Sequence, residues 1–203
     1  SFSLFQENAL VRIRPEEIVK ENFPIQTSET AFLFLQHFMK MLKVGGRAGI
    51  VIKNTFLSID DNSLISLRKE ILNEYNLHTI LDLPQGTFQG AGVKTVVLFF
   101  EKGTSTKRIW YYQLNLDRKL GKKKPLTVED LSEFTNLYKN KKETYNSWFV
   151  DVKDVDKKSF DLSVNNPNVV EHVDERKPDE ILSEIESLEV NTNKILKQIR
   201  KIL

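Results

Sequence analysis

Apolar residues recur at helical spacing in three stretches of the chain. The first helix is predicted over 28–42, with Ser28 at the N-cap and two glycines at 45 and 46 that are typical of a helix end. A second helix is predicted over 63–75, and a third over 128–141, opened by Thr127. The positions expected to face a core are Phe32, Leu35, Phe38, Met39 and Leu42, then Leu64, Leu67, Ile71 and Leu72, then Leu131, Phe134, Leu137 and Tyr138.

Short apolar runs between the helices predict strands. The run at 47–52 is nearly continuous and indicates a buried strand, and further strands are predicted at 77–83, 93–100, 108–114 and 148–150. Helix and strand alternate as far as residue 83, as in parallel sheets whose strands are joined by helical crossovers. The strands at 93–100 and 108–114 have no helix between them, so we expect antiparallel additions at the sheet edge. The pattern predicts an α/β fold.

A different pattern fills the end of the chain. Apolar residues over 178–203 alternate at spacings of four and three, which is a heptad seam with one polar interruption at Thr192. The seam consists of Ile181, Ile185, Leu188, Thr192, Ile195, Ile199 and Ile202. We therefore expect four regions: an irregular N-terminal arm at 1–27, an α/β domain at 28–114, a charged extension with one helix at 115–177, and an amphipathic C-terminal helix at 178–203.

Composition restricts the function without identifying it. The 203 residues carry 30 basic and 28 acidic side chains, so any basic surface has to be local. Cysteine is absent, which excludes thiolate chemistry and a disulfide framework. The three histidines lack metal-ligand spacing, so no metal site is expected. No apolar run approaches the roughly 20 residues that span a bilayer, and we expect an intracellular protein without membrane contact.

Three short motifs carry a resemblance. Leu-Lys-Val-Gly-Gly-Arg precedes the first strand, Leu-Pro-Gln-Gly-Thr-Phe occupies 83–88, and Gly-Val-Lys-Thr at 92–95 leads into Leu-Phe-Phe. In this order and spacing they resemble the methyltransferase subunits of type I restriction–modification systems, over residues 22–168. The resemblance implies the C-terminal half of a Rossmann-like methyltransferase sheet with late antiparallel strands, plus a C-terminal helix. It also implies a cytoplasmic, prokaryotic protein that works on DNA with a specificity subunit and a restriction subunit.

Members of that family methylate the exocyclic amine of adenine with S-adenosylmethionine. They bind this donor through a Gly-rich loop after the first strand and act through an Asn-Pro-Pro-aromatic loop. Neither element occurs here, and Asn165-Asn166-Pro167-Asn168 lies too late in the chain to be the catalytic loop. We therefore expect no catalytic residue in this chain and no S-adenosylmethionine bound to it. A non-catalytic assembly module, or a methyltransferase acting on RNA or protein, remains an alternative.

The resemblance also suggests contacts with the target. Phe88 either packs against a flipped base or folds back onto the core, and Gly86 beside it fits a phosphate cradle or a simple hairpin. Lys94 either meets a DNA phosphate or points outward from an edge strand, and the lysines of the next loop, Lys122, Lys123 and Lys124, either contact phosphates or are solvated. In the family, the C-terminal end contacts the specificity subunit, which favours a partner helix over one packed on its own domain.

Overall fold

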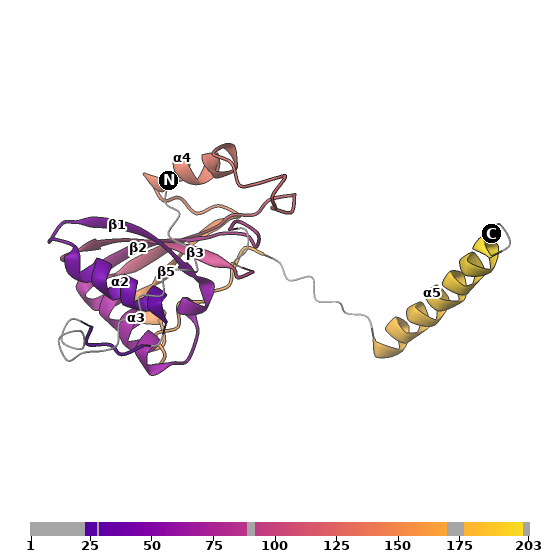
Figure 1. Cartoon of the computed structure of the whole chain (residues 1–203), viewed down its shortest axis with the longest axis horizontal. Helices are drawn as coiled ribbons and strands as arrows, with labels where there is room; N and C mark the ends of the chain where they lie inside the picture. The colour runs from indigo at the N-terminus through magenta and orange to yellow at the C-terminus, as the bar shows by residue number, and fades with distance from the viewer. Residues whose placement is uncertain (1–22, 28, 89–91, 170–176, 201–203) are drawn as a thin grey trace. The chain divides into compact units, whose positions relative to one another are not determined.

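The computed structural model describes residues 23–27, 29–88, 92–169 and 177–200 (Figure 1). It divides into one compact unit over 1–168 and a second over 169–203. The first unit holds a five-stranded sheet in the order β1-β3-β2-β4-β5. Its strands are β1 (Arg47–Lys53), β2 (Tyr75–Asp82), β3 (Thr95–Lys102), β4 (Arg108–Gln113) and β5 (Ser147–Asp151).

Helices cover both faces of this sheet. Figure 1 shows α2 (Thr30–Met41) and α3 (Asn62–Glu74) on one face and α4 (Ser132–Tyr138) on the other. Three short 3-10 turns complete the described unit: η1 (Asn54–Leu57), η2 (Glu129–Leu131) and η3 (Val152–Asp154). All three helix predictions are confirmed, but the third is shorter than expected because its first turn is η2.

The helix starts follow local capping chemistry. The Asp61 carboxylate accepts hydrogen bonds from the backbone N–H groups of Ser63 and Leu64, at 2.9 and 3.3 Å, and so caps α3. Glu29 occupies the N-cap position of α2 without a side-chain cap, while the predicted cap Ser28 lies outside the described residues.

The strand order corrects one prediction. β3 is antiparallel as expected, but it lies inside the sheet between β1 and β2, and β4 pairs in parallel with β2. A five-residue link, 103–107, carries the chain across the amino end of β2. The buried Thr106 holds it there, since its N–H donates to Leu72 O at 2.8 Å and its hydroxyl accepts from Leu77 N at 2.8 Å. A parallel neighbour therefore forms without a helical crossover.

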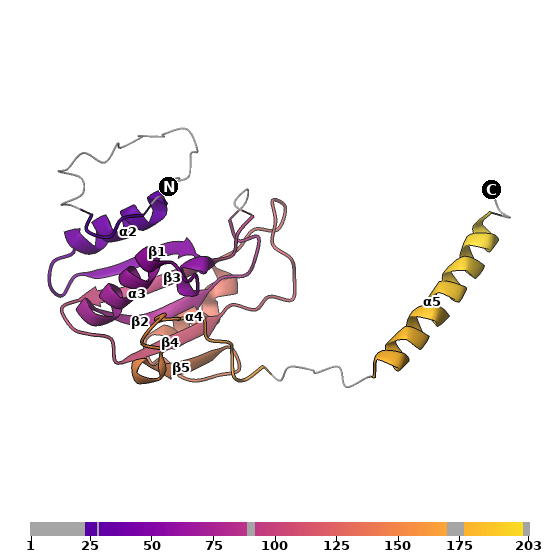
Figure 2. The same cartoon turned by 90° about the horizontal axis from the view of Figure 1, so that it is seen from below.

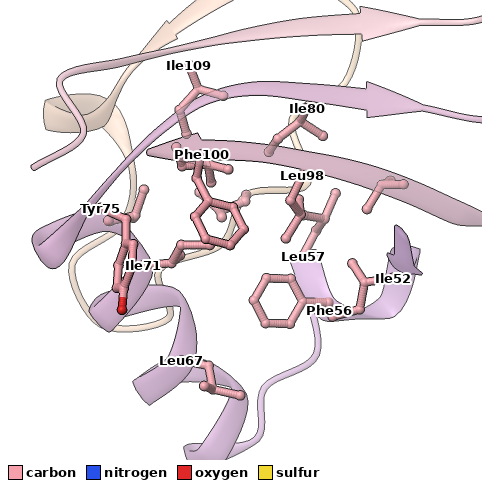
Figure 3. Packing of buried hydrophobic residues seen from close by; sticks show 14 of the residues in the cluster. Ile52, Phe56, Leu57, Leu67, Ile71, Tyr75, Ile80, Leu98, Phe100 and Ile109 are labelled. Atoms are coloured by element: carbon pink, nitrogen blue, oxygen red, sulfur yellow. The ribbon is translucent and has the colours of Figure 1, made fainter. Parts of the chain in front are cut away.

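The main core lies between the sheet and the helices α2 and α3. Figure 3 shows Leu98 and Phe100 of β3 facing Phe56 and Ile71, all of them fully buried. A second core lies under α4, where the rings of Trp110 and Phe134 stack with centroids 5.8 Å apart. Both faces of the central strands are thus apolar, which explains their nearly continuous hydrophobic runs.

Two apolar side chains are more exposed than the sequence predicts. Phe38 was expected to face the core, yet its side chain is 42% exposed on the outer face of α2. Val51 in β1 is 39% exposed, because β1 is an edge strand and not the buried strand that its composition indicates. Apolar content alone does not distinguish an edge strand from a central one.

The second unit contains α5 (Pro178–Ile199). It begins at the predicted residue, and its side chains from 182 to 200 are exposed all round the helix. Four residues of the predicted seam are among the exposed apolar side chains: Ile185, Leu188, Ile195 and Ile199. Among the described residues, no helix has the length and apolar content needed to cross a membrane.

Candidate functional site

Three strands of the sheet end at the same edge. β1 and β2 are both antiparallel to β3, and β4 is parallel to β2, so all three run in one direction. Backbone hydrogen bonds join their carboxyl ends: Asn54 N donates to Lys94 O at 2.9 Å, and Leu114 N donates to Asp82 O at 2.9 Å. In α/β sheets the carboxyl edge is where ligands bind, and we call this the carboxyl edge.

The loop between β2 and β3, residues 83–94, leaves the sheet at this edge and carries Phe88. Its first turn is closed by Thr87, whose N–H and hydroxyl both donate to Pro84 O, at 3.3 and 2.7 Å. The Phe88 side chain is 41% exposed and belongs to neither core cluster. An aromatic face is therefore held outside the core at the carboxyl edge.

An ion pair closes the two ends of that loop. Lys94 Nζ lies 2.6 Å from Asp82 Oδ2, and the Asp82 side chain is only 22% exposed. Burial raises the pKa of the Asp82 carboxyl above its usual value, and the hydrogen bond and charge of Lys94 oppose that shift. The fold therefore buries most of the Asp82 side chain and pairs its carboxylate with Lys94.

The lysine loop after β4 is an ordered hairpin. Gly121 and Lys124 exchange both backbone hydrogen bonds, at 3.1 and 3.0 Å, which places Lys122 and Lys123 at an exposed tip. Arg118 holds the base of the hairpin by donating to Lys124 O at 3.1 Å and to the carboxylate of Asp130. We call residues 118–124 the lysine hairpin.

The half-buried Asp130 completes that support. Its carboxylate accepts from the backbone N–H of Thr127 at 2.8 Å, and this bond is the main reason why the pKa of Asp130 lies below its usual value. Asp130 therefore stays charged under Arg118 over the whole neutral range. A fixed base of this kind preorganises the lysines at the tip.

Gly86 brings the two loops together. It has φ +87°, and a Cβ atom added there would lie 2.9 Å from the carbonyl oxygen of Leu120 in the lysine hairpin. Figure 2 shows the two loops projecting side by side from one end of the sheet. A glycine is required both by the left-handed backbone and by this close approach.

Gly86→Ala should separate the lysine hairpin from the Phe88 loop. The added methyl group meets backbone, which has little freedom to yield, and the positive φ adds about 1–2 kcal/mol of strain. We expect faster tryptic cleavage in the lysine hairpin of the mutant. Gly92→Ala is the matched control, because Gly92 has φ +60° but nothing within 4 Å of its added Cβ. Equal cleavage in the two mutants would show that the contact does not hold the hairpin.

Comparison with known proteins gives this geometry a context. Residues 7–176 match the family described as N-6 DNA Methylase. The chain belongs to this family of DNA methylases. The methylase subunit of the type I restriction enzyme EcoEI from Escherichia coli is 32% identical over 201 residues, covering 93% of this chain and 41% of that subunit. The EcoKI methylase subunit from Escherichia coli is 35% identical over 130 residues, covering 59% of this chain and 24% of its own length.

Solved structures agree with the family assignment. A chain from a type I R-M system superposes with a TM-score of 0.69 at 32% identity, covering 93% of this chain and 42% of that one. A modification subunit of a putative type I restriction enzyme from Vibrio vulnificus also gives 0.69, at 33% identity, over 76% of this chain and 36% of its own. The chain thus has the methylase fold and spans less than half the length of these relatives.

The site residues that the sequence suggested lie close together in the structure. The structure brings Phe88, Gly86, Lys94 and the lysine hairpin to one edge of the sheet, although the loops are about 30 residues apart in sequence. Sequence reasoning missed Arg118 and the role of Asp82. The sequence does contain a signal for the ion pair, because an acidic residue, Asp82, and a basic residue, Lys94, flank a glycine-rich loop.

The Asn-Asn-Pro-Asn segment at 165–168 makes structural contacts in this chain. Asn166 Nδ2 donates to Tyr145 O at 2.9 Å, and Asn168 Nδ2 donates to Thr144 O at 2.8 Å. These side-chain amides hold the segment beside β5. In a catalytic loop, the amides would have to be free to bind the substrate.

The last question about this site is whether it could hold a metal ion or the methyl donor. They contain no group of three or more His, Cys, Asp or Glu side chains placed to hold a metal ion. S-adenosylmethionine needs free acceptors for its ribose hydroxyls and ammonium group. Two carboxylates near the carboxyl edge, Asp82 and Asp130, do not meet this need, because they are already paired with Lys94 and Arg118.

Proposed function

We propose that the full-length protein is the modification subunit of a type I restriction–modification enzyme, which transfers a methyl group from S-adenosylmethionine to the exocyclic amine of adenine in DNA. The observation that carries this proposal is the exposed Phe88, held at the carboxyl edge of a chain in the N-6 DNA methylase family. This part of the protein supplies contacts to the target, and the donor and catalytic loops belong to the portion of the subunit that the chain does not span.

Phe88 fits the recognition of an extrahelical base. The amine of adenine is inaccessible inside the stack, so the base has to leave the duplex at a cost of a few kcal/mol. An aromatic face returns about 1–3 kcal/mol per stacked base. Phe88 presents such a face at the carboxyl edge of the sheet. The turn that carries it is fixed by the hydrogen bond from the Thr87 hydroxyl to Pro84 O.

The lysine hairpin fits the phosphates that flank such a base. Lys122 and Lys123 are exposed at its tip, and Lys124 and Lys119 add charge beside them. Each phosphate neutralised by a lysine releases counterions, which strengthens binding to DNA of any sequence. Because Gly86 touches Leu120, the charged hairpin and the aromatic face are presented together.

The proposed partners are DNA, the specificity subunit and the restriction subunit of the same system. α5 is the element of this chain that fits a protein partner, since its apolar seam begins at the partly exposed Ile181 and continues through the exposed Ile185, Leu188, Ile195 and Ile199. The EcoEI and EcoKI methylase subunits come from Escherichia coli, and we propose that this protein likewise acts on DNA in a prokaryotic cytoplasm.

Phe88→Ala in the full-length subunit tests the proposed function. Loss of a stacking face worth about 1–3 kcal/mol should lower kcat/KM for adenine methylation about 5- to 150-fold, with little change in melting temperature. Phe88→Tyr keeps the ring and should retain most of the activity. The measurements are methyl transfer to DNA from labelled donor and thermal unfolding.

Phe38→Ala is the control for loss of an exposed ring, because Phe38 on α2 is exposed to nearly the same extent as Phe88, 42% against 41%. If Phe88→Ala lowers the melting temperature but keeps the activity per folded molecule, Phe88 is a core residue and not a base contact. Methyl transfer to RNA or protein in place of DNA would favour the second enzyme class, and no transfer by the assembled enzyme would favour an assembly module.

A further inference from the structure

The neck of the Phe88 loop contains a charged pair that the proposed function does not use. Asp82 is the last residue of β2, and Lys94 immediately precedes β3. Their side chains meet at 2.6 Å across the two ends of the loop. We infer that this ion pair is a latch that holds the Phe88 loop in the position for base stacking, which makes Asp82 and Lys94 positioning residues for adenine methylation. The inference rests on the proposed function.

The latch is tied to all three strand ends at the carboxyl edge. Lys94 O accepts from Asn54 N, beyond the end of β1, at 2.9 Å. Leu83 N donates to Thr95 O at 3.1 Å, and Asp82 O accepts from Leu114 N at 2.9 Å. Both members of the ion pair therefore have fixed backbones, and the loop between them starts and ends at defined points. A loop held at its neck samples fewer orientations, and this favours a single placement of its aromatic residue.

The local electrostatics couple the ion pair to the loop. Asp82 is mostly buried, and its Oδ1 atom is fully buried without a hydrogen-bond partner in the described structure. A carboxylate with so little hydration depends on its counter-ion, because removal of one partner leaves an uncompensated charge. Lys94 is thus held over Asp82 and brings the far end of the loop with it.

The same geometry argues against Lys94 as a phosphate ligand. To reach a phosphate, its ammonium group would have to leave the buried Asp82 carboxylate unpaired and close to DNA, which is also negative. Lys122 and Lys123 carry no such restriction, since both are exposed at the tip of the lysine hairpin. The two kinds of lysine should therefore respond differently to salt.

The test compares Asp82→Asn, Lys94→Met and the double mutant in the assembled full-length enzyme. Each single mutant should lower kcat up to about 100-fold, because a displacement of about 1 Å has an effect of that size. The double mutant should be no worse than either single mutant, since both remove the same interaction. The charge swap Asp82→Lys with Lys94→Asp should recover part of the activity.

Three further readouts separate a latch from a merely structural role. Fluorescence of 2-aminopurine at the target position should report weaker stacking in both single mutants. The salt dependence of DNA binding should be unchanged in Lys94→Met. In the control Lys123→Met, the slope of log K against log salt should fall by about 1. Hydrogen exchange at the amides of Leu83 and Asn54 should be faster in Asp82→Asn. These amides donate to the carbonyl oxygens of Thr95 and Lys94, which lie at the second end of the loop.

Opposite results overturn the inference. If Lys94→Met lowers the salt slope while Asp82→Asn keeps full turnover, Lys94 is a phosphate ligand. If exchange at Leu83 and Asn54 is the same in all variants, no latch exists. Failure of the proposed function is distinct: the unmutated enzyme would then methylate no adenine, whatever the exchange rates show.

Discussion

Replacing Ile195 and Ile199 of α5 by Asp should abolish co-purification of the full-length protein with its specificity subunit and leave the α/β unit folded. Both side chains are about half exposed, at 56% and 47%. Burial of each against a partner is worth about 1.5–3 kcal/mol, and a buried unpaired carboxylate reverses that sign. The measurement is affinity purification of the co-expressed subunits, with circular dichroism of the mutant.

The helix is suited to this role by its surface. An isolated helix of its length is marginal in water, so a second surface is needed to stabilise it. The polar residue in the seam, Thr192, donates its hydroxyl to Leu188 O at 2.8 Å and can be buried without an unpaired group. Thr192 then restricts the register of pairing more than it adds stability.

The control mutant carries Asn193→Asp and Lys197→Asp, which add at least as much negative charge on the opposite face of α5. This mutant should still co-purify with the specificity subunit. If the Ile195 and Ile199 mutant also co-purifies but its α/β unit melts, then α5 packs on its own chain and the partner assignment is wrong.

The second large effect concerns stability. Arg68→Met should lower the free energy of unfolding by about 4 kcal/mol, at about 1–2 kcal/mol for each carbonyl left without a donor. Arg68 on α3 is fully buried, and its guanidinium donates to Phe56 O at 2.8 Å, Ile59 O at 3.0 Å and Ser159 O at 2.8 Å. It therefore fastens η1 and the segment after β5 to one helix.

Urea denaturation of the purified chain measures this loss. Arg108→Met is the control, because the Arg108 side chain is 54% exposed, its ion pair with Asp151 is long, at 4.0 Å, and its guanidinium lies 3.8 Å from the centroid of the Phe149 ring. An exposed ion pair and an exposed cation–π contact are each worth at most about 1 kcal/mol. A loss for Arg68→Met no larger than that of the control would mean that the three carbonyls find other donors.

Local chemistry in the sequence was sufficient to predict most elements. Periodicity located both ends of α2 and α3 to within two residues and the first residue of α5, and Thr127 opens the turn that leads into α4. The three short motifs, in their order and spacing, correctly indicated the family, and the motif at 83–88 lies on a loop that leaves the sheet. These features depend on residues close together in the chain, so hydrophobic spacing and capping are enough to reveal them.

Sequence patterns alone predict the α/β class, the helix and strand positions, the family and the seam of α5. They do not predict that β3 lies between β1 and β2, that Phe38 is exposed, or that Gly86 approaches Leu120 closely; these features appear only in the folded chain. The same is true of the contact between Lys94 and Asp82. The physical reason is that strand order, burial and ion pairing depend on which distant segments meet. Periodicity describes only the face of a single element and carries no information about its neighbours.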